Sequence, residues 1–289
     1  MAQGNVLTND SRHRKTKLSA YVPSFNNERT IYSALWSLKN QSLPPCELFQ
    51  VDDGSVDCSG DITNSLVDAI YQNSSNCGRG AVRAKAMQLA KHDLVLSCDA
   101  TNYLQIDFVK RAIKWFDDPS VAGVYGQIWQ ESPNTVSDRW RKRHLFKAKA
   151  KQDISYNAIL STYGCILRRS AVLSIGNFDC NLRHSEDADL GKRLLEAGYK
   201  VVFDPSLHVI STVSNNAIEV LDRYWRWNAG PDERSDLRQY ARNVWYSITV
   251  LARRDMEDGD FMAMPISLAC PHYQFWKSSW RLLAGKVQR

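Results

Sequence analysis

Three polar clusters, each directly after a short apolar run, carry side chains that could bind a nucleotide. Their sequences are Pro23-Ser24-Phe25-Asn26, Asp52-Asp53-Gly54-Ser55 and Asp99-Ala100-Thr101-Asn102. Asp52 and Asp53 can accept hydrogen bonds from a base imide or a ribose hydroxyl, and Gly54 allows a close approach of the backbone. A plain Asp-Gly turn is the alternative explanation of the second cluster.

A fourth cluster, His184-Ser185-Glu186-Asp187-Ala188-Asp189-Leu190, brings three carboxylates together. Leu190, Leu194 and Leu195 form an apolar helical face, so the acids fall in the first turn of a helix. The helix dipole favours anions at this end. Simple capping of the helix by acids is therefore the alternative to a role in chemistry.

The elements that position these clusters alternate between strand and helix patterns. Strand-like runs lie at 17–23, 46–52, 69–73 and 93–99, and helical patterns lie between them at 31–38, 62–69 and 79–90. Strands that alternate with helices of this length predict a parallel sheet with right-handed crossovers. Ligands collect at the carboxyl ends of such strands. We therefore expect the first three clusters to share one edge of the sheet.

The second half of the chain is less regular. It predicts strands at 121–128, 164–170 and 201–212 and helices at 138–153 and 186–197. Helices rich in aromatic residues are expected over 217–289. We expect three parts: a flexible basic tail over residues 1–16, an α/β domain over 17–230 and a helical C-terminal extension over 231–289.

Composition narrows the class of protein. The 289 residues are 44% apolar and 24% charged, as in a globular protein. The net charge of +6 suits phosphate-bearing ligands, but it is too small to indicate nucleic acid binding. Seven cysteines without CxxC spacing indicate reduced thiols. With no signal peptide and no apolar run long enough to span a bilayer, we expect a cytoplasmic protein that contacts the inner membrane face at most peripherally.

A basic stripe suggests where such a membrane contact would lie. Arg139, Arg143, Lys147 and Lys151 recur at four-residue steps in the predicted helix 138–153. Such a stripe is either a solvated helix face or a surface for acidic lipid headgroups.

Four segments, in order, resemble the sequence blocks of family 2 glycosyltransferases, which have a GT-A fold. They are VPSFNNE, VDDGSVD, GRGAVRAKAM with LVLSCDATN, and GNFDCNLRHSEDADLGKRLLEAGYKVVFDPSLHV. The resemblance implies an enzyme that moves a sugar from a nucleotide-diphosphate-sugar donor to an acceptor. In that family these blocks hold the donor nucleotide, and the matching residues here are Pro23, Ser24, Asn26, Glu28, Asp52, Asp53, Arg83 and Asp99.

The third block departs from the family pattern at the metal site. Relatives carry Asp-x-Asp, whereas this chain has Asp99-Ala100-Thr101 and so lacks the second carboxylate. The family's divalent cation, Mg²⁺ or Mn²⁺, stabilises the charge gained by the departing nucleoside diphosphate. Two arrangements stay open: a weakly held cation on Asp99 and His208, or neutralisation of the phosphates by Arg83 and cations near Arg226.

The fourth block implies the residue that carries the reaction. Asp187 matches the family's general base, which deprotonates the attacking hydroxyl in a direct, inverting displacement and typically contributes about 10²–10⁴-fold to the rate. Glu186 is expected to orient hydroxyl groups of the acceptor or donor.

Downstream, Arg223-Tyr224-Trp225-Arg226-Trp227 resembles the QxxRW block of some family members, with Arg223 where glutamine is usual. In relatives the Arg-Trp pair lines the acceptor site near the diphosphate, which here points to Arg226 and Trp227. A helix with a buried aromatic face is the alternative. The altered first residue and the lack of membrane spans argue against a processive polymerase.

The resemblance therefore implies a hexosyltransferase of polysaccharide biosynthesis. A UDP-sugar is the favoured donor, and the acceptor is a glycan, a lipid carrier or a similar carbohydrate. The rival interpretation is a catalytically inactive, nucleotide-sugar-binding regulatory protein, which the missing second carboxylate motivates.

Overall fold

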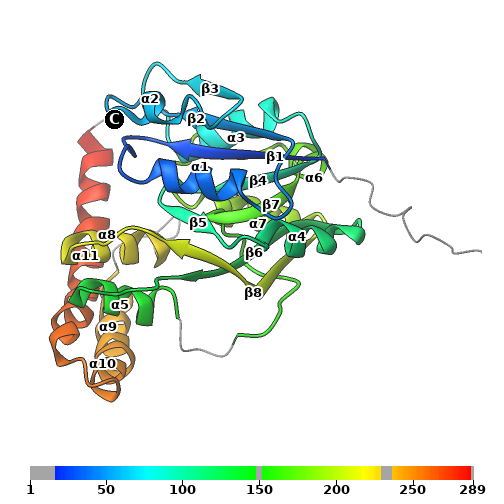
Figure 1. Cartoon of the computed structure of the whole chain (residues 1–289). Coiled ribbons are helices and arrows are strands. Elements are labelled where there is room, and N and C mark those ends of the chain that lie inside the picture. The colour runs from blue at the N-terminus through cyan, green and yellow to red at the C-terminus, as the bar shows by residue number, and fades with distance from the viewer. Residues whose placement is uncertain (1–16, 148–151, 229–235, 288–289) are drawn as a thin grey trace, which may run out of the picture.

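The computed structural model describes residues 17–147, 152–228 and 236–287, and the predicted tail over 1–16 lies outside them. The chain folds around one mixed sheet with helices on both faces and further helices at the C-terminal end (Figure 1). The predicted α/β class, with a mostly parallel sheet and a helical extension, is confirmed.

The described strands are β1 (Leu18–Ser24), β2 (Glu47–Asp52), β3 (Ala69–Gln72), β4 (Leu94–Cys98), β5 (Asn102–Leu104), β6 (Val121–Trp129), β7 (Gly164–Arg168) and β8 (Lys200–Ser211). The described α-helices are α1 (Ile31–Lys39), α2 (Ser59–Thr63), α3 (Arg79–Leu89), α4 (Phe108–Ala112), α5 (Val136–His144), α6 (Arg169–Ser174), α7 (Glu186–Glu196), α8 (Ala217–Asn228), α9 (Leu237–Tyr246), α10 (Arg253–Glu257) and α11 (Met264–Val287). Short 3₁₀ segments occupy Ile113–Asp117 and Phe261–Ala263, and a π-helical segment, Ser247–Ala252, joins α9 to α10.

The sheet order is β3-β2-β1-β4-β7-β6-β8-β5. The first four strands in this order run parallel, as the alternating sequence pattern predicts. β7 is antiparallel to both of its neighbours, β4 and β6, while β6 and β8 are parallel. Because Ser24 pairs with Asp52 at the ends of β1 and β2, the first two polar clusters lie side by side.

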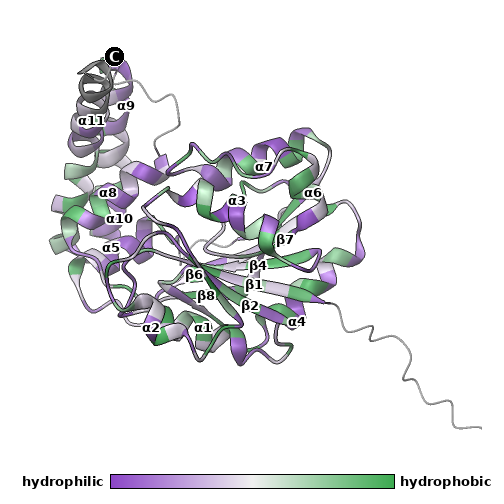
Figure 2. Cartoon of the chain, turned by 90° about the horizontal axis from the view of Figure 1, so that it is seen from above, coloured by the Kyte–Doolittle hydropathy of each residue, from purple (hydrophilic) through white to green (hydrophobic). Residues whose placement is uncertain are grey.

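Helices cover both faces of this sheet. Figure 2 shows α1, α2 and α4 on one face and α3, α6 and α7 on the other. Ile31, Leu35 and Leu38 of α1 are fully buried, as their spacing predicts, in a core shared with β1 and β4. A second core lies under α3, α6 and α7, where Leu190 and Leu194 bury the apolar face of α7.

A third core lies outside the sheet layers. Trp140 of α5, Tyr224 of α8 and Ile266 of α11 pack together there. This cluster packs the C-terminal helices against α8, and this packing fixes the position of α8 beside the sheet.

The predicted basic stripe over 138–153 is wrong. α5 ends at His144, Lys147 lies beyond it with a left-handed φ of 52°, and Lys151 falls outside the described residues. Arg139 forms two hydrogen bonds of 2.9 Å with Asp260, and Arg143 pairs with Asp258 at 2.7 Å. These cations therefore fasten α5 to the C-terminal helices and are not a free surface.

Two further elements differ from the sequence prediction. The helix expected at 62–69 is the short α2, because the chain at Asp68 already joins the sheet through its backbone N–H, which donates to Leu48 at 2.7 Å. The one or two strands expected at 201–212 form the single strand β8, with an irregular register opposite Gly126 and Gln127. No described helix has the length and apolar character that crossing a bilayer would need.

Candidate active site

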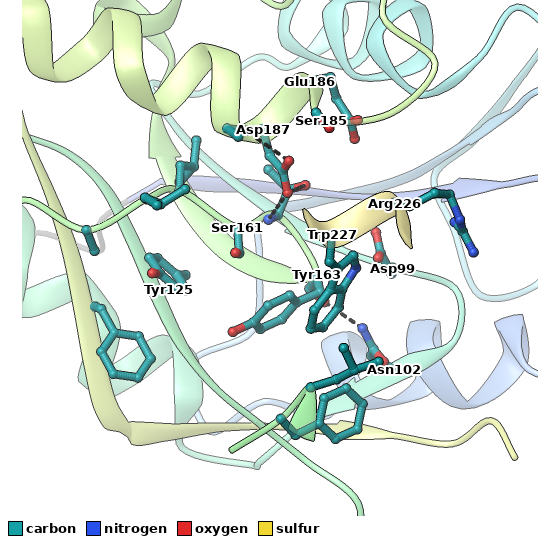
Figure 3. A pocket seen from close by; sticks show the side chains of 18 of the residues that line it. Asp99, Asn102, Tyr125, Ser161, Tyr163, Ser185, Glu186, Asp187, Arg226 and Trp227 are labelled. Carbon is teal, nitrogen blue, oxygen red and sulfur yellow. Dashed lines mark hydrogen bonds between the residues drawn. The ribbon is translucent and has the colours of Figure 1, made fainter. Parts of the chain in front are cut away.

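A cavity of about 560 Å³ opens where four parts of the chain meet. They are the end of β4, the segment 158–163, the first turn of α7 and the last turns of α8, and residues of α3, of β6 and of the segment after α5 also line the cavity. Figure 3 shows Asp187, Tyr163 and Trp227 around the same space. Of the residues predicted for the site, those that line this cavity are Arg83, Asp99, Glu186, Asp187, Arg226 and Trp227.

Arg83 forms the buried centre of the cavity floor. Its Nε donates to Glu186 at 3.0 Å and its Nη2 to Asp99 at 2.8 Å. Its Nη1 donates to Ser97 at 2.7 Å. Burial works against the charge of Arg83, but the neighbouring Tyr21, Asp99 and Glu186 raise its pKa above the ordinary value. Arg83 is therefore committed to two carboxylates inside the protein.

Glu186 and Asp187 follow each other at the start of α7, yet their surroundings differ. Glu186 is almost fully buried and faces the guanidinium of Arg83. Asp187 has no ion pair among the described residues. Its Oδ1 accepts from the backbone N–H of Ala188 at 2.9 Å, and its Oδ2 has only long contacts, 3.4 and 3.5 Å, with the N–H and hydroxyl of Thr162.

The charge on Asp187 is therefore costly. Burial, and next the charge of Glu186, raise the pKa of Asp187 to about 6, although Arg83 opposes this shift. A carboxylate of this kind is a stronger base than an ordinary aspartate and is still largely ionised at neutral pH. Its Oδ2 lies in the cavity wall, where an incoming hydroxyl could donate to it.

The residues predicted for the nucleotide at the ends of β1 and β2 are not among those that line this cavity. They are Pro23, Ser24, Asn26, Glu28, Asp52 and Asp53. Asp52 accepts from Ser24 at 2.9 Å and from the N–H of Ser55 at 3.0 Å. Asn26 Oδ1 accepts from the N–H of Val56 at 3.0 Å, and Glu28 accepts from that of Cys58 at 3.3 Å.

Asp53 fixes the loop that precedes α3 at the edge of the cavity. Its carboxylate accepts from the N–H groups of Cys77 and Gly78, at 2.8 and 2.9 Å. Gly78 has a φ of 94°, which favours glycine, and the next residue, Arg79, opens α3 and lines the cavity. The buried carboxylate of Asp53 thus fixes the loop that delivers Arg79.

The predicted metal ligands do not form a ready-made site. One oxygen of Asp99 is bound by Arg83, and Thr101 contributes only a hydroxyl to the cavity. His208 is not among the lining residues, and its ring packs edge-on against Trp129, with the centroids 5.4 Å apart. Within the described ranges, no group of three or more His, Cys, Asp and Glu side chains is placed to hold a metal ion. These residues do not fit a resident divalent cation.

Several arginines add positive charge to the lining of the cavity. Arg79, Arg223 and Arg226 line the cavity, and Arg226 pairs with Asp222 at 3.0 Å. Burial, and then the charges of Arg141, Arg226 and Arg79, lower the pKa of Arg223 to about 10. The sequence resemblance marked Arg223 only as a departure from glutamine, so its place in the cavity wall is new.

Aromatic side chains complete the cavity. Tyr125 and Tyr163 meet edge to face at 6.2 Å, and Trp227 is half exposed at the end of α8 (Figure 3). The hydroxyl of Tyr163 donates to the carbonyl of Gly126 at 2.7 Å, which fixes its ring. Sequence reasoning missed both tyrosines, because neither β6, which carries Tyr125, nor the irregular segment before β7, which carries Tyr163, has a recognisable motif.

Comparison with known proteins fits this geometry. Residues 19–176 match the family model described as Glycosyl transferase family 2. An O-antigen chain rhamnosyltransferase of Salmonella typhimurium is 24% identical over 221 residues, which are 72% of this chain and 70% of that protein.

Two solved structures are similar in fold. The mannosyltransferase PcManGT of Pyrobaculum calidifontis, in complex with GDP-Man and Mn²⁺, aligns with a TM-score of 0.58 at 15% identity, over 94% of this chain and 80% of that one. Residues 1–349 of TarS from S. aureus, in complex with UDP, align with a TM-score of 0.55 at 16% identity, over 91% of this chain and 89% of that one.

Proposed function

The chain belongs to glycosyl transferase family 2 and has the GT-A-like fold that the sequence resemblance predicts, and from this premise we propose how it acts. It transfers a hexosyl unit from a nucleoside-diphosphate sugar to an acceptor hydroxyl in one inverting displacement. Asp187 is the general base. The observation that carries this proposal is the partly buried carboxylate of Asp187, which lines a cavity of about 560 Å³ and whose Oδ2 has only long contacts with Thr162.

The reaction balances without a further co-reactant. Asp187 accepts the proton of the acceptor hydroxyl while the acceptor oxygen bonds to the anomeric carbon. The bond from that carbon to the phosphate oxygen breaks, and its electron pair leaves with the nucleoside diphosphate. Because the attack comes from the face opposite the leaving group, the anomeric configuration inverts.

The surrounding residues support this step without touching the transferred proton. Arg83 holds Glu186 and Asp99 in place, and the charge of Glu186, after burial, helps to raise the pKa of Asp187. Trp227 offers an aromatic face for the apolar side of a sugar ring. The polar clusters at the ends of β1 and β2 are proposed to hold the nucleoside, with a UDP-sugar as the favoured donor.

The acceptor is proposed to be a growing glycan or a lipid-linked carbohydrate, with one sugar added per encounter. The rhamnosyltransferase relative, which acts on an O-antigen chain by its name, supports a place in polysaccharide assembly. We also propose a peripheral contact with an anionic membrane, through α9 and not through the basic stripe that the sequence suggested.

The test is turnover of a panel of nucleotide sugars by the purified full chain, with mass spectrometry of the products. We expect one donor to be hydrolysed slowly without an acceptor and faster with one, and NMR of the fresh product to show inversion. Tight binding of a donor without any turnover, across a range of acceptors, would instead support the regulatory binder. Retention of configuration would refute the single displacement.

A further inference from the structure

We propose that Arg79 and Arg223 neutralise the donor diphosphate in the place of a divalent cation. This inference rests on the proposed function, because it concerns the same donor. It also specifies the ligand chemistry of the cavity wall: the two arginines would bind a nucleoside diphosphate through its phosphate oxygens, with no metal ion required.

The first observation is that two departures from the family pattern have opposite signs. Thr101 stands where relatives carry a carboxylate, so a negative charge is missing from the metal side of the site. Arg223 stands where some family members carry glutamine, so a positive charge is added to the lining of the cavity. The structure brings both residues to one cavity. Both differences make the cavity more positive, as the binding of an anionic ligand without a metal cation requires.

The second observation is that these cations lack counterions. Arg83 is bound to two carboxylates and Arg226 to one. The guanidinium groups of Arg79 and Arg223 form no ion pair with another described residue. Burial, and then the positive charges of Arg141, Arg226 and Arg79, disfavour the charged form of Arg223, while Asp99, the acid that favours this form, is already paired with Arg83.

Such an arrangement is costly for a protein without a ligand. Half-buried like charges repel each other, and an unpaired buried cation loses its hydration without a compensating partner. An anion that bridges Arg79 and Arg223 removes both penalties. Guanidinium groups also match phosphate oxygens in geometry, because their N–H donors lie in one plane.

A third observation concerns the way Arg79 is held. Asp53 fixes the backbone of Cys77 and Gly78, so Arg79 projects from the first residue of α3. α3 has eleven residues and its dipole favours a negative charge at that end, although the N–H of Gly80 is already taken by the carbonyl of Leu182 at 3.0 Å. The helix end, Arg79 and Arg223 therefore all contribute positive charge to the same cavity.

The experiment is titration calorimetry of the full chain with UDP, GDP and inorganic pyrophosphate, each in EDTA and each with Mn²⁺. We expect at least one of the nucleotides to bind wild type in EDTA, with an affinity that Mn²⁺ changes by less than about threefold. Arg223→Gln and Arg79→Gln should each weaken binding in EDTA by about 10- to 100-fold, as for the loss of a charged hydrogen bond. Arg223→Lys should keep most of the affinity, and Arg111→Gln, on α4 outside the cavity, should keep all of it.

A double variant adds a gain-of-function test. Thr101→Asp with Arg223→Gln restores the family pattern at both positions, so it should bind nucleotide weakly in EDTA and regain affinity with Mn²⁺. The inference is overturned if EDTA abolishes binding to wild type and Mn²⁺ restores it, or if Arg223→Gln binds like wild type in EDTA; the proposed function survives both results. If no nucleotide binds under any condition, the donor site itself is misplaced and both proposals fail.

Discussion

At the scale of single residues, two adjacent acids at the start of α7 have opposite electrostatic surroundings. Glu186 is buried and faces the guanidinium of Arg83 at 3.0 Å, whereas Asp187 is partly buried and forms no ion pair among the described residues. Placing unlike environments around neighbouring carboxylates is how proteins assign them different roles. We propose that Asp187 is the group that changes its charge during the reaction, beside the ion pair of Glu186 with Arg83.

The cost of the Asp187 charge predicts a pH-dependent effect on stability. The pKa is about 6 in the folded chain against an ordinary value of 3.8, so the folded state holds an extra proton between those values and loses stability as the pH rises through 6. Asp187→Asn removes this loss. We expect the variant to be more stable than wild type by up to about 3 kcal/mol at pH 7.5, with the difference vanishing near pH 4.

Urea unfolding at the two pH values measures this difference. Asp189→Asn is the matched control, since Asp189 lies on the same turn but is partly exposed and paired with Arg193 at 2.6 Å. A surface pair of this kind contributes at most about 1 kcal/mol. If Asp187→Asn is no more stable than wild type at pH 7.5, the carboxylate is not strained and its assignment as a base loses its physical ground.

At the scale of elements, α9 and the π-helical segment after it present an unpartnered face. Leu237, Trp245 and Ile248 share one side of this helical run and are 72%, 70% and 50% exposed. The opposite side packs on α11, where Tyr240 meets Phe275 at 4.9 Å. Residues 237–254 contain four arginines and no acid. Arg253 pairs with Glu257 at 2.8 Å, whereas Arg238 and Arg242 form no ion pair with another described residue. Exposed apolar groups beside such arginines suit the headgroup region of an anionic bilayer.

Vesicle flotation tests the proposed contact of α9. We expect the full chain to float at low salt with vesicles that contain about 30% phosphatidylglycerol in phosphatidylcholine, because the anionic lipid attracts the arginines. It should not float with vesicles of phosphatidylcholine alone. Replacing Arg238 and Arg242 with Gln should lower the partition coefficient by about 30-fold, at about 1 kcal/mol for each charge. Trp245→Ser should also weaken binding.

Trp36→Ser is the control for that experiment, because Trp36 is a half-exposed tryptophan on α1, away from the C-terminal helices. Flotation that is equal for wild type and the Arg238 and Arg242 variant would contradict the assignment. So would a wild-type chain that ignores anionic vesicles but forms dimers that Trp245→Ser dissociates, since α9 would then be an interface between copies.

At the scale of the whole molecule, local periodicity predicts the parallel half of the sheet well. The run before Asp52 and the helical face of Ile31, Leu35 and Leu38 are strong local signals, and both elements appear where they are expected. The same reasoning fails for α5. The acids that pair with Arg139 and Arg143 lie more than 110 residues further along the chain, beyond the reach of any local pattern.

The same contrast between local sequence signals and long-range contacts holds for the candidate site. The sequence blocks point to the first turn of α7 and to the end of β4, and the structure places Asp187 and Asp99 on one cavity. The other lining groups depend on long-range topology: β7 returns antiparallel between β4 and β6 and brings Tyr163, while the C-terminal core positions α8 and with it Arg223. No spacing along the chain encodes those contacts.

The most direct test of the whole account is the initial rate of sugar transfer by Asp187→Asn, beside wild type and Asp189→Asn, with donor binding measured on the same samples. We predict that Asp187→Asn binds the donor like wild type but transfers at least about 100-fold more slowly, because a positioned general base contributes about 10²–10⁴-fold. Asp189→Asn should stay within about threefold of wild type, since its ion pair lies on the helix surface. Transfer by Asp187→Asn at a rate close to that of wild type would contradict the assignment of Asp187 as the base.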